Sequence, residues 1–287
     1  MKTSLQCLPC LIKQAVDSSM LITGDEEIII DILRQVLNNL SEADLLLSPP
    51  EIAGDIQAVI RNNLSNSDPY LKIKEKSTKK AFELAPEAER LIEASKDPFA
   101  TALAFAIAGN ILDFAKNTSW DEDLINQRFS MAVEQASSFD PVQVKRLNDE
   151  ISSAGQVLFL GDNAGEAVFD RILIQYMQGS PDVYYAVKSS PVINDVTLKE
   201  ALDSGIGSCA EIIPNGADIP GTLLSRCSPE FLRIFNRADV VISKGQGNYE
   251  TLSDAERKIW FLFQVKCPVI SSHCGYKTGS WVIYERS

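Results

Sequence analysis

The sequence is poor in residues that many metal and nucleic-acid sites use. It contains one histidine, His273, and six cysteines among 287 residues. A single histidine excludes mechanisms that need several imidazoles, and so few cysteines do not indicate a secreted disulfide scaffold. Lys and Arg total 27 against 39 Asp and Glu, so the net charge is −12. This charge argues against a nucleic-acid or anionic-membrane surface, because both need a basic patch.

Long apolar runs are also missing. No run approaches the roughly 20 residues needed to span a bilayer. The first ten residues, MKTSLQCLPC, lack the apolar core and cleavage site of a signal peptide. We therefore expect a cytoplasmic protein with no membrane partner. The 45% hydrophobic content can fill a substantial core, and the length suits one large or two modest domains.

Residues 1–153 have the apolar spacing of helices and are predicted to form a mainly α-helical domain. The pairs Asp97-Pro98 and Asp140-Pro141 are typical of helix starts, because aspartate caps a helix and proline suits its first turn. Residues 71–80, LKIKEKSTKK, carry five lysines. This run predicts a solvated helix face rather than a binding site.

The helix expected over Pro98–Lys116 is hydrophobic nearly all round, so it should be buried against the second half of the chain. Within it, Asn110 and Asp113 lie three residues apart and share a face. Two polar groups on a buried helix need partners. They either bond to neighbouring backbone or project toward an active site, where they would contact substrate.

Residues 154–287 alternate between strand and helix patterns. This alternation predicts an α/β domain with a mainly parallel sheet and crossover helices. The expected helices are 168–176, 196–202 and 229–235, and the expected strands are 157–160, 183–187, 211–213, 239–242, 259–265, 269–271 and 281–284. The segment 259–265 is also compatible with a helix.

Polar side chains follow four of these strands. In parallel sheets ligands bind beyond the carboxyl ends of the strands, so these side chains should meet at one edge. They are Asp162 and Asn163 after the first strand, Lys188, Ser189, Asn194 and Asp195 after the second, Asn215, Gly216 and Asp218 after the third, and Ser243, Lys244, Gly245, Gln246, Gly247 and Asn248 at the fourth.

These residue types suit a hard divalent cation with a phosphate. Oxygen ligands favour Mg²⁺ or Mn²⁺, and Asp162, Asn163 and Asp195 would hold one ion with open positions for phosphate and water. Lys244, with Lys188, would neutralise phosphate oxygens, and an aspartate could orient or deprotonate the attacking water. Alone, Asp162-Asn163 is an ordinary Asx turn. Asp195 and Lys244 at the same edge favour the metal site.

The glycines do not indicate a dinucleotide site. GDNAGE lacks the G-x-G-x-x-G spacing, and its aspartate would repel a pyrophosphate. KGQGN lacks the Walker spacing. Gly245 and Gly247 therefore either let the backbone approach a phosphate or turn the chain.

Cys7-Leu8-Pro9-Cys10 is a lone C-x-x-C motif. It could be half a zinc site completed by Cys267, His273 or Cys274. It could also be redox-active, although no thioredoxin-like β-α-β pattern surrounds it. The interpretation we favour is that both cysteines share one helical face and pack as reduced thiols in an apolar layer.

The segments GDNAGE, VKSSPVINDVT and ISKGQGNYETLSD together resemble the metal-dependent damage-control phosphatases, also known as domain of unknown function 89. AGNILDF and the N-terminal C-x-x-C resemble the stand-alone archaeal and bacterial branch of that family. The resemblance extends from Cys7 to about Pro268, and the combination of segments is specific.

The resemblance implies a helical N-terminal part, residues 1–153, packed on a Rossmann-like three-layer α/β part, residues 154–287. It implies a divalent metal, Mn²⁺, Co²⁺, Ni²⁺ or Mg²⁺, held by the residues that match Asp162, Asn163 and Asp195. It also implies hydrolysis of small phosphorylated metabolites such as sugar phosphates, including damaged ones, with Lys244 near the phosphate. Some relatives carry an arginine-threonine-x-lysine phosphate motif near the C-terminus, where this chain has Lys277 within residues 275–279.

Two functions therefore stand at this point. The first is a metal-dependent phosphomonoester hydrolase, with Asp162, Asp195 and Lys244 as catalytic residues. Its predicted substrate contacts are Lys188, Ser189, Asn215, Ser243, Gly245, Asn110 and Asp113. The second is a non-catalytic phosphometabolite- or nucleotide-binding protein with a structural metal site.

Overall fold

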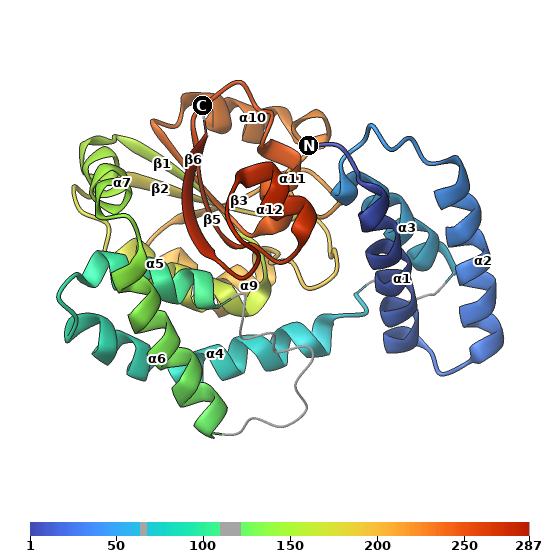
Figure 1. The fold of residues 1–287 in the computed structure, drawn as a ribbon, viewed down its shortest axis with the longest axis horizontal. Coiled ribbons are helices and arrows are strands. Elements are labelled where there is room, and N and C mark those ends of the chain that lie inside the picture. The colour runs from blue at the N-terminus through green and yellow to red at the C-terminus, as the bar shows by residue number, and fades with distance from the viewer. Residues whose placement is uncertain (64–67, 110–121, 287) are drawn as a thin grey trace.

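The sheet is the centre of the molecule (Figure 1). The computed structural model describes residues 1–63, 68–109 and 122–286. Six strands pair in the order β3-β2-β1-β4-β5-β6, and all neighbours are parallel except β5 and β6. This confirms the predicted mainly parallel sheet and the predicted strand at 281–284, which lies at the sheet edge. The strands are β1 (Gln156–Leu160), β2 (Asp182–Val187), β3 (Glu211–Pro214), β4 (Val240–Lys244), β5 (Ile259–Gln264) and β6 (Trp281–Arg286).

The strand order reverses between β1 and β4. The chain runs from β1 outward to β2 and β3, and then returns to place β4 on the other side of β1. Loops at the carboxyl ends of β1 and β4 therefore diverge, and such a switch point leaves a crevice where ligands bind in doubly wound sheets.

The first half of the chain is helical, as predicted. Asp97 and Asp140 cap their helices, because their side chains accept hydrogen bonds from the backbone N–H groups of Ala100 and Val142, each at 2.9 Å. The helices are α1 (Leu8–Ile22), α2 (Glu26–Glu42), α3 (Pro49–Asn63), α4 (Leu71–Glu93), α5 (Pro98–Ala108), α6 (Glu122–Ser138) and α7 (Pro141–Ser153).

Helices cover both faces of the sheet. Helices α4 to α7 share one core with α8 (Ala167–Gln175), α9 (Leu198–Asp203) and one face of the sheet. Helices α10 (Pro229–Arg237), α11 (Gln246–Leu252) and α12 (Pro268–Cys274) pack on the other face. Helices α1 to α3 form a separate core beside the sheet (Figure 1). The division of the chain at residue 153 stays a prediction.

Helix α5 is buried along its described length. Every residue from Phe99 to Ala108 is buried, and the helix packs on α6 and α8. Its capped, proline-initiated start and unbroken apolar surface explain this position between layers. Asn110 and Asp113 lie outside the described residues.

Two local predictions are wrong. Val269–Ser271 is not a strand but part of α12, because Pro268 at the first position favours a helical turn and Ile270 and Cys274 are buried one turn apart. The lysine-rich run is not wholly solvated, because Lys74 is 1% exposed. The segment 259–265, which was compatible with strand or helix, forms β5.

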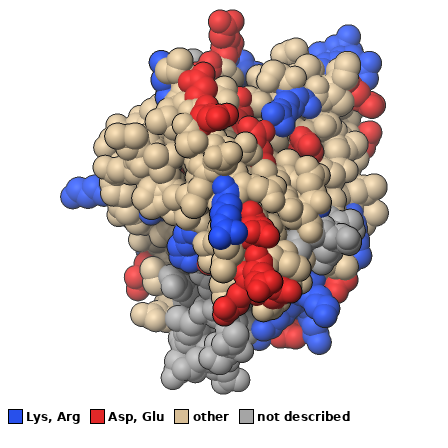
Figure 2. Space-filling model, turned by 90° about the vertical axis from the view of Figure 1, so that its right-hand side faces the viewer, with Lys and Arg blue, Asp and Glu red and all other residues tan. Residues whose placement is uncertain are grey.

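Within the described ranges, no helix combines the length and apolarity that a membrane crossing requires. On the face shown in Figure 2, the described Lys and Arg side chains are interspersed with Asp and Glu.

Candidate active site

Two predicted ligands from different loops meet at the carboxyl edge of the sheet. Asn163, which follows β1, pairs with Asp195 in an isolated antiparallel bridge. Next to it, the N–H of Val196 donates to the carbonyl oxygen of Asp162 at 2.8 Å. The segment after β2 thus lies against the segment after β1, and Asp162, Asn163 and Asp195 are brought together.

The amide of Asn163 is oriented by the carboxylates around it. Its Nδ2 donates to Asp162 Oδ2 at 3.1 Å and to Oε1 of Glu166. An amide that donates through nitrogen to two carboxylates presents its Oδ1 in another direction. Oδ1 is the only atom of this side chain that can bind a cation.

Glycine 245 makes room for the carboxylate of Asp162. Gly245 follows β4 with φ of +79°, and a Cβ there would lie 1.9 Å from Asp162 Oδ2. Both the backbone conformation and the close approach require glycine. Gly245 was predicted to contact phosphate, and in the structure its immediate neighbour is this carboxylate.

Asp195 and Glu166 are buried, Asp162 is half-buried beside them, and these carboxylates repel one another. Burial raises the pKa of Asp162 well above its ordinary value, and the charges of Glu166 and Asp195 add to this effect. Burial likewise raises the pKa of Asp195 to about 6, against the opposing charge of Lys188. Burial is therefore the main cause of both shifts, and repulsion from neighbouring carboxylates adds to it at Asp162.

Lys244 lies in a buried ion-pair cluster. Its Nζ is 2.7 Å from Asp170 Oδ1 and 3.1 Å from Glu166 Oε2, and Tyr185 donates to Asp170 at 2.8 Å. Burial disfavours the charged amine, but Asp170 and Glu166 outweigh burial and raise the pKa of Lys244. Lys244 thus anchors these carboxylates behind the site, and its predicted contact with phosphate stays a prediction.

Glu166 and Asp170 were missed in the sequence. They lie four residues apart in GEAVFDRIL and therefore share one helical face. A carboxylate on an otherwise apolar face of a helix next to GDNAGE was the available signal. Its partner was not visible, because Lys244 is 74 residues from Asp170.

The other predicted substrate contacts are held by local structure. The Lys188 ammonium lies 3.6 Å from Asp195 Oδ2 and donates to the carbonyl oxygen of Gly221. Ser189 accepts from the N–H of Gly216 at 2.6 Å, and Asn215 accepts from the N–H of Ala217 at 2.9 Å. Ser243 is fully buried, and strand alternation directs it to the opposite face from Lys244. None of these contacts tests substrate binding.

The residues present fit a hard divalent cation. Their donors are carboxylate and amide oxygens, and the buried Oδ2 of Asp195 accepts no hydrogen bond from the described residues. Around it, Asp162, Glu166 and Asp170 add three carboxylates. No cluster of three or more His, Cys, Asp or Glu suited to a metal occurs among the described residues. The predicted set contains two carboxylates and one amide, so the metal stays a proposal.

Lys266 is a cation at this site that the sequence did not reveal. It follows β5, its side chain is exposed, and its charge acts on Asp162 by opposing the rise in the pKa of that carboxyl. Its backbone N–H donates to Gln246 Oε1 at 3.1 Å, which ties it to α11. The strand-end rule could have found Lys266, because it is the second residue after β5.

The C-x-x-C motif contributes none of the predicted oxygen ligands, and charge on Glu250 and Cys267 reaches its Cys7. Cys7 is half-buried, whereas Cys10 is exposed, so the predicted packing of both thiols in an apolar layer is wrong for Cys10. Burial raises the pKa of Cys7, and charge on Glu250, Cys267 and Cys10 adds to this. Neither thiol belongs to a cluster suited to a metal among the described residues.

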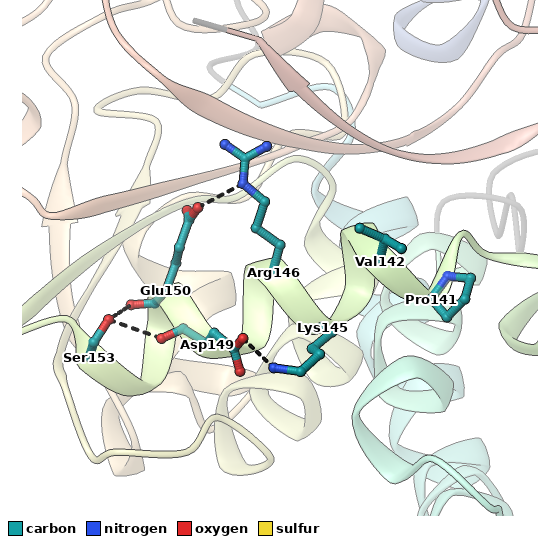
Figure 3. Close-up of a pocket in the computed structure, with 7 residues that line it drawn as sticks. All are labelled: Pro141, Val142, Lys145, Arg146, Asp149, Glu150 and Ser153. Atoms are coloured by element: carbon teal, nitrogen blue, oxygen red, sulfur yellow. Dashed lines mark hydrogen bonds and ion pairs between the residues drawn. The ribbon is translucent and has the colours of Figure 1, made fainter.

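A surface hollow along α7 is also separate from the site (Figure 3). Within it, Lys145 pairs with Asp149 and Arg146 with Glu150 along the same helix. Because α7 leads directly into β1, the hollow lies at the amino-terminal edge of the sheet, opposite Asp162. It is lined by Pro141, Val142, Lys145, Arg146, Asp149, Glu150 and Ser153.

Comparison with known proteins agrees with this fold. The Damage-control phosphatase ARMT1-like domain matches residues 3–282, so the chain belongs to this family, also known as DUF89. The damage-control phosphatase PH1575 of Pyrococcus horikoshii is 33% identical over 98% of this chain and 97% of its own length. A damage-control phosphatase of Archaeoglobus fulgidus is 30% identical over 98% of both chains. The crystal structure of the Pyrococcus horikoshii DUF89 protein is similar to this fold over the full length of both chains, with a TM-score of 0.91 and 30% sequence identity.

Proposed function

We propose that this protein is a metal-dependent phosphatase that hydrolyses phosphate monoesters of small metabolites such as sugar phosphates, including damaged ones. The observation that carries the proposal is the meeting of Asp162, Asn163 and Asp195 at the switch point of the sheet. Family membership supports the reaction class, since two relatives of nearly full-length coverage are named damage-control phosphatases.

In this proposal Asp162, Asn163 and Asp195 hold a divalent cation such as Mn²⁺, Co²⁺, Ni²⁺ or Mg²⁺. When bound, such an ion polarises a phosphoryl oxygen and lowers the pKa of a coordinated water. The repulsion between neighbouring carboxylates supports this assignment, because a cation bound among Asp162, Glu166 and Asp195 relieves it.

The side chains around the ion have separate tasks. Lys266 is exposed and close enough to act on Asp162, so we assign it to the incoming phosphate. Lys188 is paired with Asp195 and holds that carboxylate in place. Lys244 holds Glu166 and Asp170, and Glu166 in turn orients the Asn163 amide. A carboxylate at the site would orient the attacking water or accept a proton from it.

Hydrolysis of p-nitrophenyl phosphate and a panel of sugar phosphates tests the proposal. Purified protein stripped with chelator is assayed after addition of Mn²⁺, Co²⁺, Ni²⁺ or Mg²⁺. We expect activity only with added metal, and we expect Asp162→Ala and Asp195→Ala each to lose at least 100-fold in kcat/KM. Full metal-dependent activity in both variants would disprove the assigned site. Tight binding of a phosphometabolite without turnover would instead favour the non-catalytic alternative.

A further inference from the structure

Lys74 is a buried cation that the helical layer contributes next to the site. It lies in the first turn of α4, within the lysine-rich run, and its side chain is fully shielded from solvent. Helix α4 packs against both the short 3-10 helix Ala164–Glu166 and α9. The buried stripe of α4 is polar at Lys74, Ser77 and Thr78 and apolar from Ala81 onward. The polar end of the stripe thus coincides with the end of α4 that carries Lys74.

Two carboxylates neutralise Lys74. Its Nζ lies 2.6 Å from Asp68 Oδ2 and 3.0 Å from Glu200 Oε1. Glu200 is 2% exposed and belongs to the first turn of α9. A buried carboxylate in this position needs a cation, and α4 supplies it across the boundary between the two halves of the chain.

Glu200 fixes the start of α9. Its Oε2 accepts from the backbone N–H of Thr197 at 3.0 Å and from the Thr197 hydroxyl. Together with the hydrogen bond that the backbone N–H of Glu200 donates to the Thr197 side chain, this is a capping box. The two oxygens of Glu200 therefore have different partners, one in Lys74 and the other in Thr197.

Thr197 follows Asp195 by two residues in the chain. Thr197 pairs with Lys188 in a parallel bridge. The carbonyl oxygen of Val196 accepts from the N–H of Lys188, and the N–H of Val196 donates to the carbonyl oxygen of Asp162. The path from Lys74 to the Asp195 carboxylate thus runs through one side chain and three consecutive residues. The charge of Lys74 also reaches Asp195 and counters the effect of burial on its pKa.

We propose that Lys74 is a positioning residue, which holds Asp195 in its metal-binding place through Glu200 and Thr197. The inference rests on the proposed function for the identity of the ligand, but not for the contacts. Partners of this kind around metal ligands typically change metal affinity or activity by about 10- to 100-fold when they are removed. A salt bridge that only joined two layers would change stability and leave the site intact.

The experiment measures Mn²⁺ affinity and turnover in Lys74→Met, Glu200→Gln and the double variant. Free Mn²⁺ is followed by electron paramagnetic resonance during titration of the metal-free protein. The values of kcat and KM for p-nitrophenyl phosphate are then measured at saturating Mn²⁺. We expect Lys74→Met to raise the Mn²⁺ dissociation constant about tenfold and to lower kcat more than it raises KM. The double variant should lose no more than Lys74→Met, because both changes break one path.

Ile92→Ala is the matched control. Ile92 is fully buried on the same helix, at the end far from Lys74, so its truncation lowers the melting temperature without touching this path. We expect Ile92→Ala to keep wild-type Mn²⁺ affinity and kcat. If Lys74→Met does not fold, Glu200→Gln carries the test, because it keeps the shape of the side chain and removes the charge.

The outcomes separate this inference from the function. Wild-type Mn²⁺ affinity and kcat in both Lys74→Met and Glu200→Gln, with only a lower melting temperature, would overturn the positioning role. Losses that multiply in the double variant would also overturn it. A wild-type protein that binds Mn²⁺ without hydrolysing phosphate, while Lys74→Met binds it more weakly, would reject the proposed function and keep the positioning role.

Discussion

Gly245 lies directly against the carboxylate of Asp162, across the switch point between β4 and β1. A Cβ at residue 245 would come within 1.9 Å of Asp162 Oδ2, and φ at this position is +79°. The loop after one strand is therefore shaped around the side chain that follows its neighbour. This relationship ties the KGQGN segment to the proposed metal site without a phosphate or a dinucleotide.

Gly245→Ala is expected to lose at least tenfold in Mn²⁺ affinity and kcat/KM, because the new methyl group displaces Asp162. Gly275→Ala is the control for a positive φ without a close neighbour, since Gly275 has φ of +83° and no atom within 4 Å of its Cβ position. The control pays only the strain of a left-handed backbone, about 1 kcal/mol in the free energy of unfolding. Titration with Mn²⁺, enzyme assays and urea unfolding measure both variants. Equal activity losses in the two variants would show that backbone strain, and not Asp162, is responsible.

Lys266→Ala is expected to raise KM for p-nitrophenyl phosphate at least tenfold while the melting temperature changes little. The side chain is exposed and its charge acts on Asp162, so its loss removes attraction for a phosphate dianion at the site. Lys266→Arg should retain most of the affinity. Lys277→Ala tests the other exposed candidate near the C-terminus, and steady-state kinetics compare the two. An unchanged KM in Lys266→Ala together with a raised KM in Lys277→Ala would move the phosphate contact to Lys277.

Lys244→Met is expected to lower the free energy of unfolding by about 3–5 kcal/mol, because it leaves Glu166 and Asp170 buried without their cation. Tyr185→Phe removes one hydrogen bond to Asp170 and should cost only about 1 kcal/mol. Urea unfolding of the metal-free proteins gives both values. A Lys244→Met protein as stable as Tyr185→Phe, but inactive, would indicate that Lys244 acts on phosphate rather than on the buried cluster.

The metal-free protein is expected to lose stability as pH rises from about 4 to 6. The pKa of Asp195 is about 6 in the folded protein and 3.8 as its ordinary value. Between these values the folded state keeps a proton that the unfolded state has lost, so the free energy of unfolding falls with rising pH. The difference corresponds to roughly 3 kcal/mol for Asp195 alone. Above pH 6 this contribution is constant.

Asp195→Asn removes this contribution. Urea unfolding in chelator at several pH values should therefore show the variant gaining stability relative to wild type as pH rises to 6. Added Mn²⁺ should reduce the gain, because the ion favours the ionised carboxylate in the wild-type site. A stability difference between the two proteins that does not change with pH would contradict the raised pKa of Asp195.

Local chemistry was enough to predict much of the fold. The Asp97-Pro98 and Asp140-Pro141 helix starts, the change from helical to strand spacing near residue 155 and the strand-end position of Asp162 and Asp195 all follow from adjacent residues. Helix capping by a carboxylate, the fixed geometry of proline and the alternation of side chains along a strand are all local effects. They can therefore be recognised in a single sequence. The prediction of a strand at 269–271 was wrong. Val and Ile favour strands, but the proline before them favours the start of a helix.

Pairings between distant residues were decided only by the tertiary structure. Lys74 belongs to a run of lysines that looks solvated, yet the fold places its ammonium between Asp68 and Glu200. Lys244 was visible at a strand end, but not its burial against Glu166 and Asp170. The sequence by itself determined that the side chains of Asp162, Asn163 and Asp195 arrive at one sheet edge. Which lysine is buried as a partner and which stays exposed depends on how the helical layer packs, because burial and long-range charge arise only when the layers meet.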